Sequence, residues 1–99
     1  MREVRLAVVG VGHLGRHHAR VAASLAGVRM VGVHDHHPGR AEEVGRQFSL
    51  PVLPDLEAVA SEAEAVVVST PTVSHLEVAG FFLDRGLHVL VEKPIAATM

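Results

Sequence analysis

The sequence predicts an α/β fold with a doubly wound parallel sheet, as a single domain over residues 1–99. Short runs rich in Val and Leu alternate with segments of helical period along the chain. These runs are almost continuously apolar, as is typical of strands covered by helices on both faces. Right-handed crossovers between successive parallel strands then place helices on both sides of the sheet.

The boundaries of the elements follow from these runs and from the Pro and Gly residues between them. The predicted strands are Val4–Val9, Val28–Val33, Ala65–Val68 and His88–Val91. The predicted helices are His13–Leu25, Pro38–Phe48 and Val73–Arg85, the last ended by Gly86. Pro51 and Pro54 bracket a short strand at Val52 and Leu53, after which Asp55 is placed to cap a small helix.

The spacing of apolar side chains predicts which helix faces are buried. The stripe on the first helix comprises Leu14, His18, Val21, Ala22 and Leu25. The buried side of the last helix comprises Leu76, Ala79, Gly80 and Leu83. His18 is therefore expected to be a hydrogen-bonded histidine of the core.

Composition argues against several classes of protein. Nine basic and eleven acidic residues, with no basic run, predict no binding of nucleic acid or anionic lipid. No apolar run approaches the roughly 20 residues of a membrane span, and the first ten residues, MREVRLAVVG, lack the long apolar core and cleavage site expected of a signal peptide. The expected compartment is the cytoplasm, with which the absence of cysteine agrees.

A glycine-rich turn joins the first strand to the first helix, with the sequence Gly10-Val11-Gly12-His13-Leu14-Gly15. In this pattern the glycines allow a tight turn, a close approach to a diphosphate and close packing of helix on strand. The amides at the helix N-terminus then face the phosphates. We expect Gly10, Gly12, His13, Leu14 and Gly15 to bind a dinucleotide in a Rossmann fold of strand order 3-2-1-4-5. The alternative is a glycine-rich turn without a ligand.

Asp35 follows the second strand at the distance from the glycine turn where an acidic residue binds the adenosine ribose. A carboxylate there accepts hydrogen bonds from the ribose hydroxyls and repels a 2′-phosphate, so NAD is predicted in preference to NADP, which stays open. The alternative is an Asp that serves only the turn before Pro38. Arg40 could meet a phosphate but is expected on the solvent face of its helix.

Eight histidines raise the question of a metal site, above all the cluster His34-Asp35-His36-His37 and the pair His13 and His17. The cluster lies on a predicted loop, where no helical face holds ligand geometry. We expect exposed loop histidines and no metal.

Two further motifs carry a family resemblance. They are Ser69-Thr70-Pro71-Thr72-Val73-Ser74-His75 and Gly86-Leu87-His88-Val89-Leu90-Val91-Glu92-Lys93-Pro94. Together with the glycine turn they resemble the glucose-fructose oxidoreductase and inositol dehydrogenase family, often called Gfo/Idh/MocA. The resemblance covers essentially the whole chain, and Thr72 departs from the Asn usual at that position.

The resemblance implies roles for residues in both motifs. Thr70, Pro71 and His75 would line the cofactor, and Glu92 and Lys93 would match the Glu-Lys-Pro motif, whose Lys lies beside nicotinamide and substrate. In that motif the peptide bond before the Pro, here Pro94, is often cis.

The position and charge of Lys93 also favour a catalytic role, independently of the resemblance. A lysine at the carboxyl end of a parallel strand faces the ligand crevice, where its ammonium could stabilise developing negative charge on a substrate oxygen. The alternative is a solvated lysine paired with Glu92. Thr72 or Ser74 is interpreted instead as the N-cap of the following helix, with Ser74 and Glu77 at capping-box spacing.

The resemblance implies an NAD(P)-dependent oxidoreductase that transfers a hydride between the cofactor and a hydroxyl or carbonyl carbon of a sugar or polyol, commonly as a homo-oligomer. The expected domain ends before the C-terminal substrate domain of that family, so the fragment alone is expected to be inactive. Rival readings are a biliverdin-reductase-like or aldose-reducing relative, and a non-catalytic module that senses NAD(H) or assembles with a partner.

Overall fold

The predicted alternation of strands and helices is present in the computed structural model, which describes residues 3–11, 13–70 and 72–91. The strands are β1 (Val4–Val9), β2 (Val28–His34), β3 (Ala65–Val68) and β4 (His88–Val91). The helices are α1 (His13–Ala23), α2 (Pro38–Phe48), α3 (Leu56–Glu62) and α4 (Thr72–Asp84). The small helix expected after Asp55 is confirmed as α3, because the Asp55 side chain accepts a hydrogen bond from the Ala58 amide at 2.8 Å.

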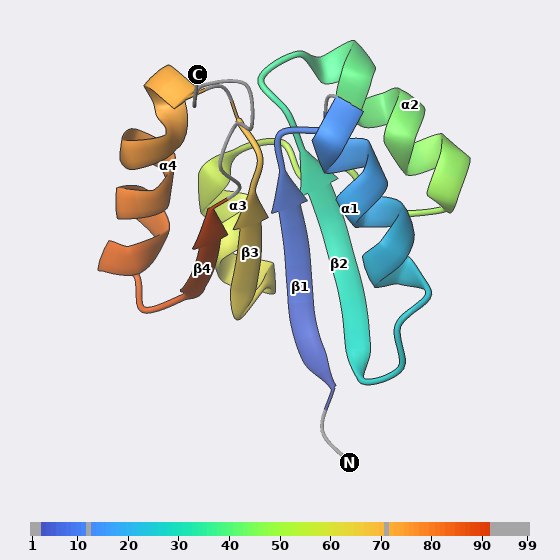
Figure 1. The fold of residues 1–99 in the computed structure, drawn as a ribbon, viewed down its shortest axis with the longest axis horizontal. Helices are drawn as coiled ribbons and strands as arrows, with labels where there is room; N and C mark the ends of the chain where they lie inside the picture. The colour runs from blue at the N-terminus through green and yellow to red at the C-terminus, as the bar shows by residue number, and fades with distance from the viewer. Residues whose placement is uncertain (1–2, 12, 71, 92–99) are drawn as a thin grey trace, which may run out of the picture.

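The strands form one parallel sheet in the order β2-β1-β3-β4 within the described residues (Figure 1). The short strand predicted at Val52 and Leu53, third along the chain, is reduced to an isolated parallel bridge between Val52 and Val33. There the Leu53 amide donates to the Val33 carbonyl at 2.8 Å, and the Val33 amide donates to the Pro51 carbonyl at 3.0 Å. The order 3-2-1-4-5 is therefore confirmed. Pro51 and Pro54 lack the amide hydrogens that a longer ladder would need.

Alternate strand residues face opposite layers, which explains why the strands are apolar throughout. Ala7, Val9, Val66 and Val68 pack in a cluster with Phe82. The residues between them face a second cluster, whose members are Val8, Val11, Ala19, Val33, Ala41, Val44 and Val67. Helices α1 and α2 cover this second cluster, and α3 and α4 cover the first (Figure 1).

The predicted buried stripe of α1 is wrong in part. Val21 and Leu25 are exposed, and the helix ends at Ala23, two residues before Leu25. Among the described residues of α1, the buried ones are small, namely Gly15, Ala19 and Ala22. Small residues at these positions allow the helix to pack closely on the sheet. His18 is only partly buried, and the side chain of Leu14 lies outside what is described.

On α4 the predicted face is displaced by one residue. Ala79 is buried as expected, but Leu83 is 60% exposed while its neighbour Phe82 is fully buried. The larger ring fills the space between α4 and the sheet, within the cluster that contains Val68 and Leu87. The side chain of Leu76 is not among those described.

The two ends of α4 test the predictions of an N-cap at its start and of a glycine stop at its end. The helix begins at Thr72, so Ser74 lies within its first turn and is not its N-cap, whereas the cap contacts at Thr72 lie outside what is described. Gly86 ends it as predicted, with φ of 80°, and the amides of Gly86 and Leu87 donate to the carbonyls of Leu83 and Phe82.

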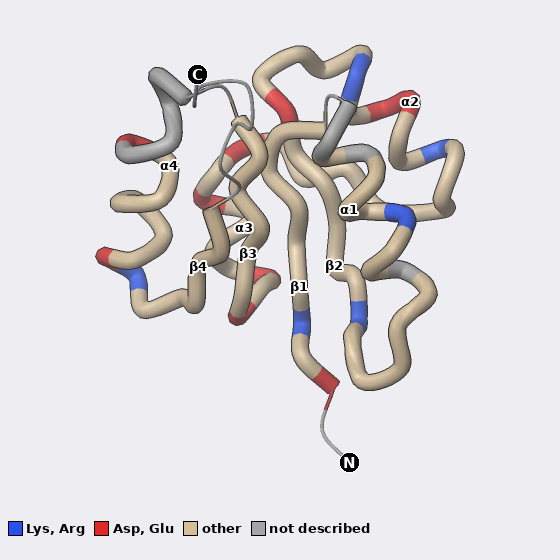
Figure 2. The backbone as a smooth tube through the Cα atoms, viewed as in Figure 1, with Lys and Arg blue, Asp and Glu red and all other residues tan. Residues whose placement is uncertain are grey.

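Charged residues lie on the helices, near strand ends and in the connections between elements (Figure 2). In the strands, Arg5 and Arg29 are the second residues of β1 and β2, and both are exposed. Strand β4 forms one edge of the sheet, where Leu90 and Val91 are exposed among the described residues. In the part of the chain that the structure describes, no helix has the length and apolar character needed to cross a membrane.

Ser49 ends α2 in the left-handed conformation, with φ of 56° and ψ of 46°. This conformation is strained for residues with a side chain, so Ser49→Gly is expected to raise the free energy of unfolding by about 0.5 to 1 kcal/mol. Urea unfolding measures the change. The matched control is Ser61→Gly inside α3, which is expected to lower stability instead. A loss of stability in both variants would contradict a strained backbone at Ser49.

Candidate functional site

The carboxyl ends of the parallel strands meet at one edge of the sheet, which is the upper edge in Figure 1. Gly10 follows β1, Asp35 follows β2 and Thr70 lies two residues after β3. The chain crosses from β1 to β2 on one side and later returns to β3 on the other. Such a switch in strand order opens the crevice where sheets of this kind bind ligands.

The glycine turn is packed so closely that side chains are excluded at two of its positions. Gly10 has φ of 91°, and a Cβ there would lie 2.8 Å from the backbone of Ser69. A Cβ on Gly15 would fall on the carbonyl oxygen of Gly10. The turn thus lies against both the loop after β3 and the first turn of α1, as predicted for these two glycines.

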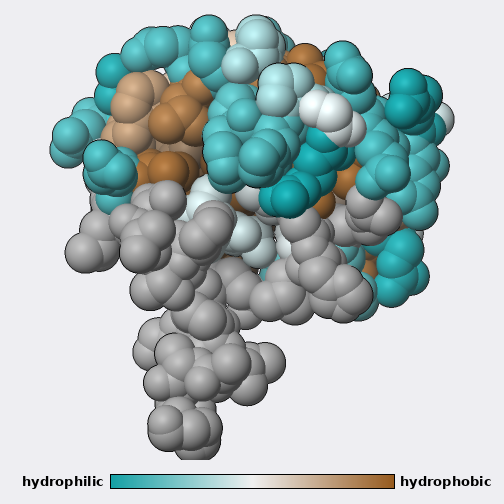
Figure 3. All heavy atoms as spheres, turned by 90° about the horizontal axis from the view of Figure 1, so that it is seen from above, coloured by the Kyte–Doolittle hydropathy of each residue, from teal (hydrophilic) through white to brown (hydrophobic). Residues whose placement is uncertain are grey.

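A cleft of about 200 Å³ opens beside this turn. Its lining residues are Val9, Gly10, His34, Asp35, His36, Leu56, Thr70 and Val78. Figure 3 views the molecule from this edge and shows apolar residues among hydrophilic ones on its described part. The structure therefore brings Gly10, Asp35 and Thr70 together around one cavity, with Gly15 packed beneath the turn.

The apolar lining of the cleft was not predicted. Leu56 and Val78 come from α3 and α4, far along the chain from the glycine turn. Each looks like an ordinary core residue in the sequence, so no local signal marks it as part of a site. His34 and Val9 could have been found, because both are strand residues next to predicted site residues.

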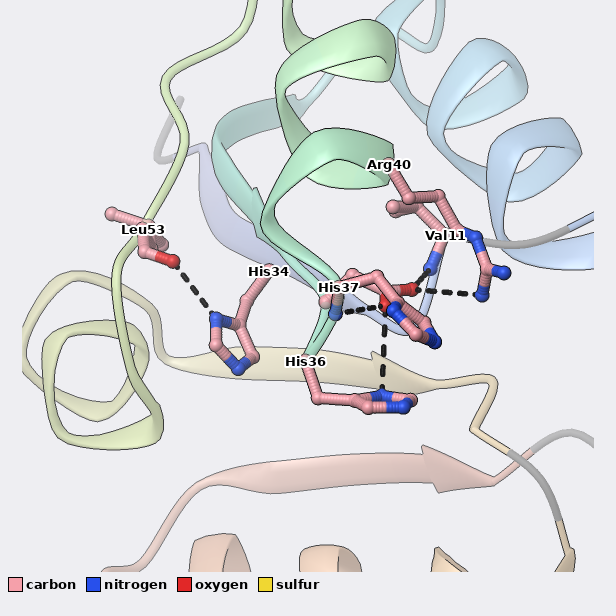
Figure 4. Close-up of polar contacts among 7 residues, drawn as sticks. Val11, His34, His36, His37, Arg40 and Leu53 are labelled. Carbon is pink, nitrogen blue, oxygen red and sulfur yellow. Dashed lines mark hydrogen bonds and ion pairs between the residues drawn. The ribbon is translucent and has the colours of Figure 1, made fainter.

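Asp35 is the one polar or charged residue among the described residues that is fully buried, with an exposed fraction of 6%. One carboxylate oxygen accepts from the Val11 amide and the other from the His37 amide, both at 2.8 Å. The Arg40 guanidinium lies 3.7 Å from the carboxylate (Figure 4). Arg40 was expected on the solvent face of α2, but its end turns toward Asp35 while its side chain stays 45% exposed.

The histidine cluster is divided by the fold. His36 and His37 are exposed loop residues, as predicted, with ring centroids 4.3 Å apart. His34 is partly buried, and its Nδ1 lies 2.9 Å from the Leu53 carbonyl oxygen (Figure 4). Within the described ranges, no group of three or more His, Asp or Glu side chains is arranged to hold a metal ion.

The polar groups and the apolar lining of the cleft are of the kinds that bind part of a dinucleotide. Thr70 Oγ1 is buried and has no hydrogen-bond partner among the described residues, so it is available to a polar ligand. The N-terminus of α1, an 11-residue helix, follows the tight glycine turn and favours negative charge. The apolar lining suits a ring system, and the buried carboxylate suits sugar hydroxyls.

Several predicted site residues lie outside the described residues. They are Gly12, Pro71, Glu92 and Lys93, and the peptide bond before Pro94 lies there as well. His13 and Leu14 belong to the first turn of α1, and His75 to α4, but their side chains are likewise not described.

The fold and the cleft together define a nucleotide-binding domain of the Rossmann class. Residues 4–99 match the model of the oxidoreductase family with an NAD-binding Rossmann fold, called GFO_IDH_MocA. The chain belongs to this family, and NAD is the cofactor of its domain.

Relatives of known name agree with this membership. The chain is 39% identical to UDP-N-acetylglucosamine 3-dehydrogenase from Acidithiobacillus ferrooxidans, over 95% of this chain and 29% of the relative. A crystal form of that enzyme superposes with a TM-score of 0.89 and covers 95% of this chain and 30% of the enzyme chain. Inositol 2-dehydrogenase from Rhizobium meliloti is 33% identical, over 93% of this chain and 28% of the relative.

A solved structure with bound coenzyme is also similar. GenD2 from gentamicin A biosynthesis, in complex with NAD, has a TM-score of 0.89 and 30% identity, over 96% of this chain and 28% of that chain. The chain thus spans less than a third of the length of the relatives named above.

Proposed function

We propose that the chain is the coenzyme-binding domain of a dehydrogenase that acts on a hydroxyl or carbonyl carbon of a sugar- or cyclitol-like substrate. The observation that carries this proposal is the meeting of Gly10, Asp35 and Thr70 around one cleft at the carboxyl edge of the sheet. The substrate class is supported by the names of the relatives, which are dehydrogenases of UDP-N-acetylglucosamine and inositol.

Each predicted site residue has a role in this proposal. The glycine turn, with Gly10, Gly12, His13, Leu14 and Gly15, would hold the diphosphate at the N-terminus of α1. Asp35 would accept hydrogen bonds from the adenosine ribose. The residues proposed to line the rest of the coenzyme are Thr70, Pro71, His75 and Glu92.

When bound, the nicotinamide ring supplies the hydride acceptor or donor. Lys93 is proposed as the catalytic residue, and its role rests on the Glu-Lys-Pro motif and on its place after β4. Its ammonium would hydrogen-bond the substrate oxygen and stabilise negative charge that develops there. The family resemblance supports a homo-oligomer, and the compartment proposed for this reaction is the cytoplasm.

Titration of the purified chain with NADH and NADPH tests the proposal. The chain contains no Trp and no Tyr, so nicotinamide fluorescence can be followed without protein emission near it. We expect NADH to bind at least about tenfold more tightly than NADPH, because the Asp35 carboxylate repels a 2′-phosphate.

Asp35→Ser is the matching variant and should reduce the difference in affinity between NADH and NADPH. Tighter binding of NADPH by the wild-type chain would contradict the role of Asp35. Binding of neither coenzyme would contradict the proposed function as a whole.

A further inference from the structure

The Asp35 carboxylate connects two loops that are distant in the sequence. Its side chain is 3% exposed and lies among four groups, which are the amides of Val11 and His37, the Arg40 guanidinium and the His36 ring (Figure 4). Three of these groups follow Asp35 closely in the chain. Val11 precedes it by 24 residues and belongs to the glycine turn.

The contact with Val11 acts on the beginning of that turn. Val11 is fully buried, and its amide donates to Asp35 Oδ2 at 2.8 Å. A buried amide without an acceptor raises the free energy of the folded state. Any movement of the peptide between Gly10 and Val11 that breaks this hydrogen bond is therefore unfavourable, so the peptide is restrained. Gly12, the middle glycine of the turn, is the next residue in the sequence. The carboxylate thereby restrains the peptide just before Gly12, where the amides proposed to bind the diphosphate begin.

We propose that Asp35 is a positioning residue for the diphosphate-binding turn, in addition to being the ribose ligand of the proposed function on which this inference rests. The two roles are compatible. Each carboxylate oxygen has two lone pairs, and each accepts one backbone hydrogen bond here, so acceptor capacity is left for ribose hydroxyls. The affinity for a diphosphate should then depend on Asp35 even when the ligand has no ribose hydroxyls.

Two nucleotides separate the roles, because ADP carries both ribose hydroxyls and 2′,3′-dideoxy-ADP carries neither. Both are titrated into the wild-type chain and Asp35→Asn, with amide chemical shifts as the measure of binding. We expect Asp35→Asn to weaken dideoxy-ADP binding by about tenfold, since the single amide oxygen of Asn cannot serve both backbone amides. The loss for ADP should be larger.

The control is Glu64→Ala. The Glu64 carboxylate also accepts a backbone hydrogen bond, from the Arg5 amide at 3.0 Å, but at the amino end of β1. This variant should bind both nucleotides as the wild-type chain does. Equal loss in both variants would assign the effect to general destabilisation and overturn the inference.

Hydrogen exchange adds a readout that needs no ligand. In Asp35→Asn the Val11 amide should exchange at least about tenfold faster, while amides of Ala7 to Val9 in β1 keep their rates. Acceleration throughout β1 would indicate ordinary loss of stability and would count against positioning.

The outcomes distinguish this inference from the proposed function. If Asp35→Asn weakens ADP but not dideoxy-ADP, Asp35 is a ribose ligand alone, and the inference fails while the proposed function stands. If the wild-type chain binds neither nucleotide and no NADH, the proposed function fails and the inference with it.

Discussion

Gly15→Ala is expected to abolish coenzyme binding and to lower the free energy of unfolding by about 3 kcal/mol. The added Cβ would fall on the carbonyl oxygen of Gly10, which is backbone and has no rotamer by which to move away. Relief requires α1 to shift away from the glycine turn. That shift would separate the helix N-terminus from the place where the diphosphate is proposed to lie.

Urea unfolding and NADH titration measure the two effects. Gly39→Ala is the matched control, because a Cβ at this helical position in α2 would meet no heavy atom within 4 Å beyond its chain neighbours and the backbone of its own helix. It should raise stability by about 0.4 to 1 kcal/mol and leave NADH affinity unchanged. Retention of both stability and coenzyme affinity in Gly15→Ala would show that the close contact between Gly15 and Gly10 is not needed.

Phe82→Ala is expected to lower the free energy of unfolding by about 3 to 5 kcal/mol. Phe82 is fully buried between α4 and the sheet, and its ring packs edge-on against Phe81 with centroids 5.2 Å apart. Truncation removes apolar burial and leaves a cavity that the rigid sheet cannot close. A loss of this size is a large share of the stability of a small domain.

Leu83→Ala is the control for Phe82→Ala, since Leu83 is the next residue and is 60% exposed. Its effect on urea unfolding should stay within about 0.5 kcal/mol. If Leu83→Ala were the more damaging of the two substitutions, the face of α4 toward the sheet would be the one that apolar spacing predicts, and the observed packing would be wrong.

The comparison of Leu83 with Phe82 shows how far apolar spacing reaches. The spacing predicts that α4 is a helix with one buried side, and this is confirmed. It cannot choose between neighbouring residues when both are large and apolar. The choice depends on the space left by the sheet and by residues such as Leu87, which is set only when the layers pack.

The residues of the candidate site also include some that the sequence predicts and some that it does not. Gly10, Asp35 and Thr70 follow strands whose carboxyl ends meet at one edge in a parallel sheet, so their convergence follows from the predicted topology. Leu56 and Val78 enter the cleft from helices on one face of the sheet, and nothing in their sequence neighbours distinguishes them from core residues. Arg40 is exposed on α2, as expected, but helical periodicity could not show that its guanidinium lies 3.7 Å from the buried Asp35 carboxylate.

By itself the sequence determined the succession of strands and helices, the tight turn at Gly10 and the family of the chain. These features depend on local backbone preference and on motifs of consecutive residues. Only the tertiary structure decided that the Asp35 carboxylate holds the Val11 amide and that small residues of α1 face the sheet. Both are contacts between segments that are remote in the chain, and they form only when the two layers of helices pack on the sheet.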